Sequence, residues 1–123
     1  MDRVFVITVC RNAAKLIEPT MLSVLNQTYG NLDYIVIDGA STDGTTDIIR
    51  RNGDRLSYWV SEPDGGIYDA MNKGVQMAQS MVREGETAWV NFMNAGDCFS
   101  DNEVVEDFFV EKEGCPPYPE QAK

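Results

Sequence analysis

Short apolar runs alternate with longer helical patterns along this chain. The apolar runs predict strands near 4–9, 33–37, 56–60 and 87–93. Between them, apolar residues recur at intervals of three and four, which is typical of helices that pack one face on a sheet. The alternation predicts an α/β fold class, with a mainly parallel sheet flanked by helices.

Four helices are expected between and after these strands. The first contains Pro19 in its first turn, where a missing N–H costs nothing. A short second helix follows the capping cluster Ser41-Thr42-Asp43. The spacing of apolar residues predicts a third helix over 67–81 and a fourth near 101–109.

Composition excludes several classes of protein. A chain of 123 residues suits one domain, expected over 1–110, and the prolines near its end predict an irregular tail over 111–123. The longest apolar run, Val4–Cys10, is shorter than the roughly 20 residues of a membrane helix, so no integral membrane segment is expected. The net charge of −10 argues against nucleic acid as a partner, because phosphates need a basic surface.

Residue types narrow the chemistry further. The three cysteines have no paired spacing, which suits a reduced, cytoplasmic protein better than a disulfide frame or a zinc site. The sequence contains no histidine, which excludes a His-based catalytic triad.

Polar loops follow three of the expected strands. Ligands of an α/β sheet bind outside the carboxyl ends of the strands, so these loops predict one shared site. The three loops are Asp38 with the cluster at Ser41, Glu62-Pro63-Asp64-Gly65-Gly66, and Asn94-Ala95-Gly96-Asp97.

The first loop offers a carboxylate for a nucleobase. Asp38 ends a run of buried character, and a carboxylate there can accept the imide N–H of a pyrimidine base. The alternative, a residue that only stabilises a turn, is favoured for Asp43. Asn12, after the first strand, either caps the neighbouring loop or contacts a ligand.

The second loop has the features of a diphosphate cradle. Gly65 and Gly66 let the backbone approach a ligand at a helix N-terminus. Lys73 is a phosphate partner if it faces the cleft, although a lysine on a helix is more often solvated. For Asp69 and Asn72, which share one helix face, capping and ligand contact stay equally open.

The third loop offers a metal ligand. Hard divalent cations take oxygen ligands and often share one or two carboxylates with substrate phosphates, a role that Asp97 fits. A simple turn would explain the pair Gly96-Asp97 but not the second polar residue, Asn94.

The ordered motifs of this chain resemble family-two glycosyltransferases of the GT-A fold, in particular the bacterial members that build colanic acid and other surface polysaccharides. The likeness covers residue 4 to about residue 109. The motifs are Thr8-Val-Cys10-Arg-Asn12, Ser23-Val-Leu-Asn-Gln27-Thr-Tyr29, Ile37-Asp38-Gly-Ala-Ser41-Thr-Asp43-Gly-Thr45, Glu62-Pro-Asp64-Gly65-Gly66-Ile-Tyr68-Asp69-Ala-Met-Asn72-Lys73-Gly74 and Asn94-Ala95-Gly96-Asp97.

The resemblance implies the Rossmann-like half of that fold, which binds a UDP- or GDP-linked sugar for transfer with inversion to a glycan or a lipid-linked acceptor. By matching position, Thr8 and Asp38 would hold the base, Asp64 would lie near the ribose or diphosphate, and Asp97 would bind Mn²⁺ or Mg²⁺. Further donor contacts would come from the same motifs, including Cys10, Asn12, Ser41, Asp69, Lys73, Asn94, Ala95 and Gly96. A cytoplasmic location is implied, with peripheral attachment to the inner face of the membrane as a further option.

The chain departs from the family pattern in two places. Family members usually carry an Asp-x-Asp cluster, whereas this chain keeps only Asp97, with Asn94 and Gly96 at the other acidic positions. The catalytic base is expected beyond Lys123, on the acceptor-binding half, so that an open sheet edge would remain and favour self-association into a homo-oligomer.

The first hypothesis is therefore the donor-binding portion of an inverting glycosyltransferase. A non-catalytic nucleotide-sugar-binding module is the alternative. A nucleotidyltransferase ranks last, because the segment after the first strand contains no glycine.

Overall fold

The computed structural model describes the backbone of residues 1–114 and the side chains of residues 1–110. Four parallel strands form one sheet in the order β3-β2-β1-β4. In chain order, the elements are β1 (Arg3–Cys10), α1 (Ile17–Leu25), β2 (Leu32–Asp38), α2 (Thr45–Arg51), the 3₁₀ helix η1 (Gly53–Arg55), β3 (Tyr58–Ser61), α3 (Ile67–Met81), β4 (Ala88–Phe92) and α4 (Val104–Gly114).

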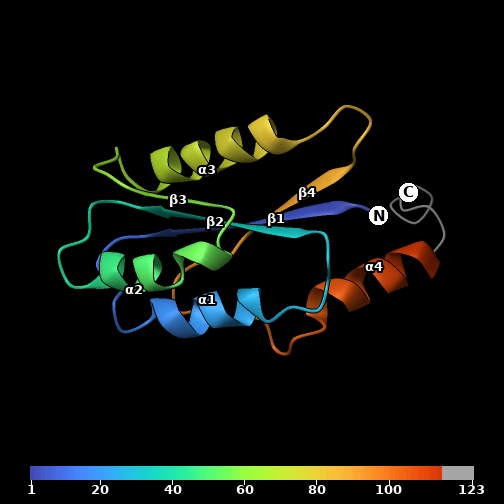
Figure 1. Cartoon of the computed structure of the whole chain (residues 1–123), viewed down its shortest axis with the longest axis horizontal. Coiled ribbons are helices and arrows are strands. Elements are labelled where there is room, and N and C mark those ends of the chain that lie inside the picture. Colours follow the sequence, from blue (N-terminus) through green and yellow to red (C-terminus); the bar gives the residue numbers. More distant parts are fainter. Residues whose placement is uncertain (115–123) are drawn as a thin grey trace, which may run out of the picture.

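The sheet lies between two layers of helices. Helix α3 covers one face, and α1, α2 and α4 cover the other (Figure 1). Alternate side chains of β1 supply the two cores: Phe5 and Ile7 pack under α3, whereas Val4 and Val6 belong to the opposite core. Because both faces are covered, the central strands are apolar almost without interruption, which is why the sequence revealed them.

The predicted fold class and the order of strands and helices are confirmed. Each predicted strand lies within two residues of the observed one, and α3 spans the residues that the spacing predicted. No helix within residues 1–114 is long and apolar enough to span a membrane.

The last helix differs from its prediction at both ends. It begins at Val104, because the Asp101 side chain accepts the Glu103 N–H at 2.8 Å and holds the preceding residues in a turn. It continues to Gly114, since the prolines that forbid a helix come only afterwards. The irregular tail expected from residue 111 therefore does not start there, and residues 115–123 lie outside the described part of the chain.

Helix α3 lies close against the sheet at Gly74. A Cβ atom at this position would lie 2.6 Å from Cγ2 of Ile7 and 3.6 Å from Cγ1 of Ile37. The first distance is too short for any real contact, so glycine is what allows α3 to lie this close to β1 and β2. The position of α3 also sets the position of its first turn at the carboxyl edge of the sheet.

We expect Gly74→Ala to destabilise the protein by about 1–3 kcal/mol, the usual cost of overpacking a core. This value is the net loss: alanine gains about 1 kcal/mol over glycine from its higher helix propensity, and the steric clash costs more than that. Urea unfolding followed by circular dichroism measures it. Gly30→Ala is the control, because a Cβ there meets nothing within 4 Å. Equal stability of the two variants would contradict the packing explanation.

Strand β4 leaves one edge of the sheet open. Among the described residues it pairs with β1 alone, and each of its residues is exposed. Its sequence, Ala-Trp-Val-Asn-Phe, has neither the charge nor the proline that usually protects an edge strand. Val90 and Phe92 are 45% and 40% exposed.

We expect the chain to self-associate through this edge as its concentration rises, and Val90→Lys to weaken the association, because a lysine on an edge strand opposes pairing. Sedimentation velocity over a range of concentrations measures both. Val110→Lys, which removes an exposed valine of α4, is the matched control. A wild-type chain that stays monomeric at high concentration would refute this expectation.

Candidate functional site

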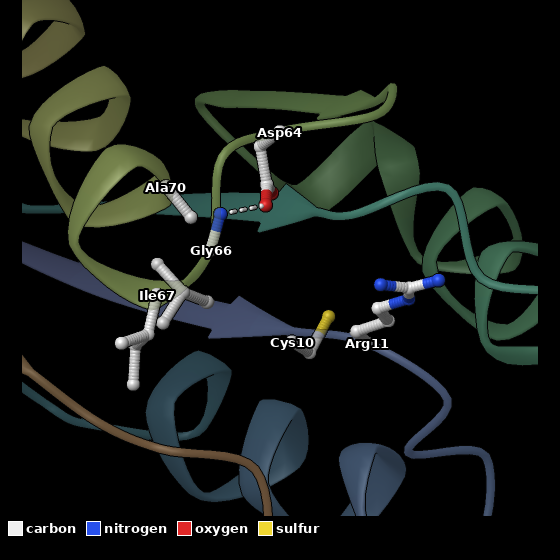
Figure 2. Close-up of a pocket in the computed structure, with 7 residues that line it drawn as sticks. Cys10, Arg11, Asp64, Gly66, Ile67 and Ala70 are labelled. Carbon is white, nitrogen blue, oxygen red and sulfur yellow. Dashed lines mark hydrogen bonds between the residues drawn. The ribbon is translucent and has the colours of Figure 1, made fainter.

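A pocket opens at the carboxyl end of β1 and faces the start of α3 (Figure 2). Its volume of about 280 Å³ is just below the range of small-molecule sites, which run from about 300 to 1,000 Å³. The chain order of the strands reverses at β1, and open α/β sheets bind ligands at such a switch point. The lining residues are Val9, Cys10, Arg11, Asp64, Gly66, Ile67 and Ala70.

Asp38, the predicted base ligand, is fully buried and hydrogen-bonded on both oxygens. Its Oδ2 accepts from the Ser41 N–H at 3.1 Å, the Thr46 hydroxyl at 3.0 Å and the Ser61 hydroxyl at 2.8 Å. Its Oδ1 accepts from the Ser41 hydroxyl and the Cys10 thiol. A direct contact between Asp38 and a base does not fit this geometry, because the carboxylate has no exposed surface.

Thr8, the second residue expected to hold the base, is fully buried as well. Its hydroxyl is 2.7 Å from the Tyr34 hydroxyl, so that the two share one hydrogen bond inside the core. Like Asp38, Thr8 does not line the pocket.

The local environment fixes the charges of Asp38 and Cys10 in opposite directions. Burial alone would raise the pKa of Asp38, but the hydrogen bonds from Ser41, Ser61 and Thr46 outweigh it and lower that pKa. Burial, reinforced by the Asp38 charge, raises the pKa of the Cys10 thiol. Cys10 therefore stays protonated at neutral pH and donates a hydrogen bond in the pocket wall rather than acting as a thiolate nucleophile.

Polar side chains join the loops that follow β1 and β2. The Asn12 Oδ1 accepts the Thr42 N–H at 2.8 Å, and the Asn12 N–H donates to the Ser41 hydroxyl at 2.8 Å. Asn12 has a φ of 51°, in the left-handed region that asparagine tolerates better than most residues. Asn12 and Ser41 therefore join the two loops in the structure. For Asn12, this is the capping role, one of the two roles that the sequence left open.

Asp43 has the turn role that was favoured for it. Its carboxylate accepts the Ala14 N–H and the Thr45 N–H, each at 3.1 Å, and so links the loop after β1 to the start of α2. The Thr45 hydroxyl also donates to it, and this bond lowers the pKa of Asp43.

Carboxylates already occupy the two N–H groups of the predicted phosphate cradle. Gly65 donates to Oδ2 of Asp69 at 2.8 Å, and Gly66 donates to Oδ1 of Asp64 at 3.0 Å. Gly66 has a φ of 111°, which favours glycine at this turn into α3. Asp64 points into the pocket (Figure 2), whereas Asp69 does not line it. An anion at this helix N-terminus would have to displace one of the two carboxylates.

Lys73 and Arg11 differ in their availability to a ligand. The Lys73 Nζ lies 3.1 Å from Oε1 of Glu62, whose hydrogen bond raises the pKa of Lys73, and this lysine lines the groove between β3 and α3. Arg11 lines the pocket and, among the described residues, has no hydrogen-bond or ion-pair partner. Arg11 lies within the first motif, but no role was predicted for it; its place directly after a buried strand puts it at the carboxyl edge of the sheet.

The third loop lies at the same edge but outside the pocket lining. The Gly96 N–H donates to the Thr20 hydroxyl at 2.8 Å, which holds the turn against α1. The Asp97 side chain is exposed and bonds to no described residue, and Asn94 is exposed beside it. Gly96 has a φ of 102°, a conformation in which an acidic side chain would be strained.

Asp97 and Asn94 can bind a metal ion only together with ligands that the described residues do not supply. Within the described residues, no three His, Cys, Asp or Glu side chains are grouped to enclose a cation. One free carboxylate and one carboxamide suit a divalent ion that takes its other ligands from water and phosphate oxygens.

Comparison with known proteins identifies the family. The model of glycosyl transferase family 2 matches residues 5–109. The chain belongs to glycosyltransferase family 2. An uncharacterized glycosyltransferase of Mycobacterium tuberculosis is 40% identical to it over 103 residues, which are 83% of this chain and 37% of the relative. This family 2 chain thus spans little more than a third of the length of that relative.

Two solved structures share the fold of this family 2 chain. TarS of Staphylococcus aureus, in complex with UDP-GlcNAc, has a TM-score of 0.74 at 20% identity, over 91% of this chain and 31% of that one. The mannosyltransferase PcManGT of Pyrobaculum calidifontis, in complex with GDP-Man and Mn²⁺, has a TM-score of 0.66 at 28% identity, over 81% of this chain and 29% of its own. The Rossmann-like GT-A fold that the motifs implied is thereby confirmed.

We expect Asp38→Asn to destabilise the protein at neutral pH by about 1–3 kcal/mol, because an amide cannot accept all the hydrogen bonds that the carboxylate accepts. The pKa of Asp38 is lower in the folded state, so its contribution is present above about pH 4 and is lost as the pH falls through the folded-state pKa. Urea unfolding at several pH values should show the gap between wild type and variant narrowing on acidification. A gap that stays constant with pH would contradict this role.

Proposed function

We propose that this family 2 chain forms the donor-binding part of an inverting glycosyltransferase, which moves a sugar from a UDP- or GDP-linked donor to a saccharide or lipid-linked acceptor in polysaccharide biosynthesis. The observation that carries the proposal is the pocket at the carboxyl end of β1, which is lined by the Asp64 carboxylate and by Arg11, whose guanidinium has no partner within the described part of the chain. TarS and PcManGT, which share the fold, are complexed with nucleotide sugars. A cytoplasmic site of action, with peripheral attachment to the inner face of the membrane, suits a donor of this kind.

Arg11 is the residue best suited to the donor diphosphate. A guanidinium binds phosphate oxygens through two parallel N–H groups, and Arg11 has no competing partner among the described residues. Lys73 is less suited, because it is paired with Glu62 and faces the other groove. In a chain with a net charge of −10, a cation beside the pocket favours the binding of an anionic ligand there.

Asp97 is the proposed ligand of Mn²⁺ or Mg²⁺, with Asn94 and donor phosphates completing the shell. Such an ion, when bound, would offset the charge that develops on the departing diphosphate. The side chain of Asp97 is exposed and has no partner among the described residues, which leaves both oxygens available for this role. The PcManGT complex, which contains Mn²⁺, supports the use of a divalent ion.

A nucleotide-sugar-binding module without transfer activity is the second candidate. The single carboxylate of the third loop favours it, since one anionic ligand holds a metal ion less tightly than two or three. Slow hydrolysis of a UDP- or GDP-linked sugar by the wild-type chain, abolished by Asp97→Ala, would eliminate this candidate.

We expect calorimetric titration of the folded chain to show that UDP, GDP and their sugars bind in a Mn²⁺-dependent manner. Asp97→Ala should weaken the Mn²⁺-dependent part about tenfold or more, as loss of a metal ligand or its support usually does. Asp54→Ala, an exposed carboxylate on η1 outside the pocket, should leave binding unchanged. Absence of metal-dependent binding to all of these nucleotides would refute the proposal.

A further inference from the structure

We infer that Asp64, rather than Asp38, reads the nucleobase of the donor by accepting a ring N–H of uracil or guanine. This inference rests on the proposed nucleotide-sugar site and names the side chain that selects the base within it. It assigns Asp64 to the base in place of the ribose or diphosphate.

The buried residues Thr8 and Asp38 are not accessible to a nucleobase. Thr8 and Asp38 both have 0% exposure, and their polar atoms are bonded to other side chains of the core and loops. A base could reach neither of them without dismantling the hydrogen bonds that join β1, β2 and β3. A carboxylate that reads a base must therefore come from another segment.

The Asp64 carboxylate lies beside Gly39, at the end of β2. Gly39 follows Asp38 directly and has no side chain, and a Cβ atom there would lie 3.0 Å from Oδ2 of Asp64. The Asp64 carboxylate thus lies at the end of β2. It is next to the position that the side chain of residue 39 would occupy. The loop before α3 therefore places the Asp64 carboxylate at the end of β2, where the Asp38 carboxylate is buried.

The two oxygens of Asp64 differ in their hydrogen bonds. Oδ1 accepts the Gly66 N–H at 3.0 Å, which fixes the side chain. Oδ2 has no hydrogen-bond partner among the described residues. The carboxylate points into the pocket, with Ile67 and Cys10 below it and Arg11 across from it (Figure 2). A flat base between these walls would present its edge to the free oxygen.

The chemistry of a carboxylate then limits which bases fit. An ionised carboxylate only accepts hydrogen bonds. Uracil and guanine carry a ring N–H on the edge used in base pairing, whereas cytosine and adenine carry a lone pair at the equivalent ring nitrogen, which a carboxylate repels. The pocket should therefore prefer uridine and guanosine diphosphates to cytidine and adenosine diphosphates.

Asp64→Asn tests this role with little disturbance of the loop. The amide oxygen of asparagine can still accept the Gly66 N–H, while the free acceptor becomes a donor. In titrations with Mn²⁺ present, we expect the affinity of the variant for UDP and GDP to fall about tenfold or more, the usual effect of losing a charge-assisted hydrogen bond. Its affinity for CDP and ADP should not fall. Asp54→Asn makes the same charge change outside the pocket and should leave all four affinities unchanged.

Gly39→Ala tests the position of Asp64 independently. Its Cβ would push Oδ2 of Asp64 by a few tenths of an ångström, so UDP and GDP affinity should fall while thermal stability stays near that of wild type. Unchanged binding of UDP and GDP to a folded Asp64→Asn variant would overturn the inference and leave the proposed function standing. An equal loss for all four nucleotides would also overturn it, because Asp64 would then act on the shared ribose or diphosphate. Failure of the wild-type chain to bind any nucleotide diphosphate would refute the proposed function itself.

Discussion

The arrangement of the carboxyl edge depends on one buried charge. Asp38 gathers hydrogen bonds from β1, from the loop before α2, from α2 itself and from β3, through Cys10, Ser41, Thr46 and Ser61. A buried carboxylate is costly unless its oxygens are bonded, and here every partner comes from a different part of the edge. The result is a bonded junction of four segments, and one of its members, Cys10, also lines the pocket.

The sequence predicted the fold well and the contacts of the site only in part. Uninterrupted apolar runs identify β1 and β2 because both faces are covered, and the spacing over α3 identifies that helix because one stripe faces the sheet. Parallel topology then places all three polar loops on one edge. What a polar residue touches there depends on partners far away in the chain, such as Tyr34 for Thr8 or Ser61 for Asp38, and no local pattern specifies them.

Three carboxylates at one edge serve different purposes because their surroundings differ. Asp38 is buried and hydrogen-bonded on both oxygens. Among the described residues, Asp64 has a partner for one oxygen only, and the exposed Asp97 carboxylate has none. Glycines make these differences possible. Gly39 has no side chain where the Asp64 carboxylate lies, and the positive φ of Gly96 disfavours a second acidic side chain next to Asp97.

The Cys10 thiol has a consequence for the durability of the molecule. Its raised pKa, caused first by burial and then by the Asp38 charge, keeps the sulfur in its weakly nucleophilic, protonated form although it lines a pocket. Hydrogen peroxide and alkylating agents react with the thiolate form of cysteine, so a protonated thiol reacts with them more slowly. Burial and the Asp38 charge together therefore lower the reactivity of the Cys10 thiol in the pocket wall.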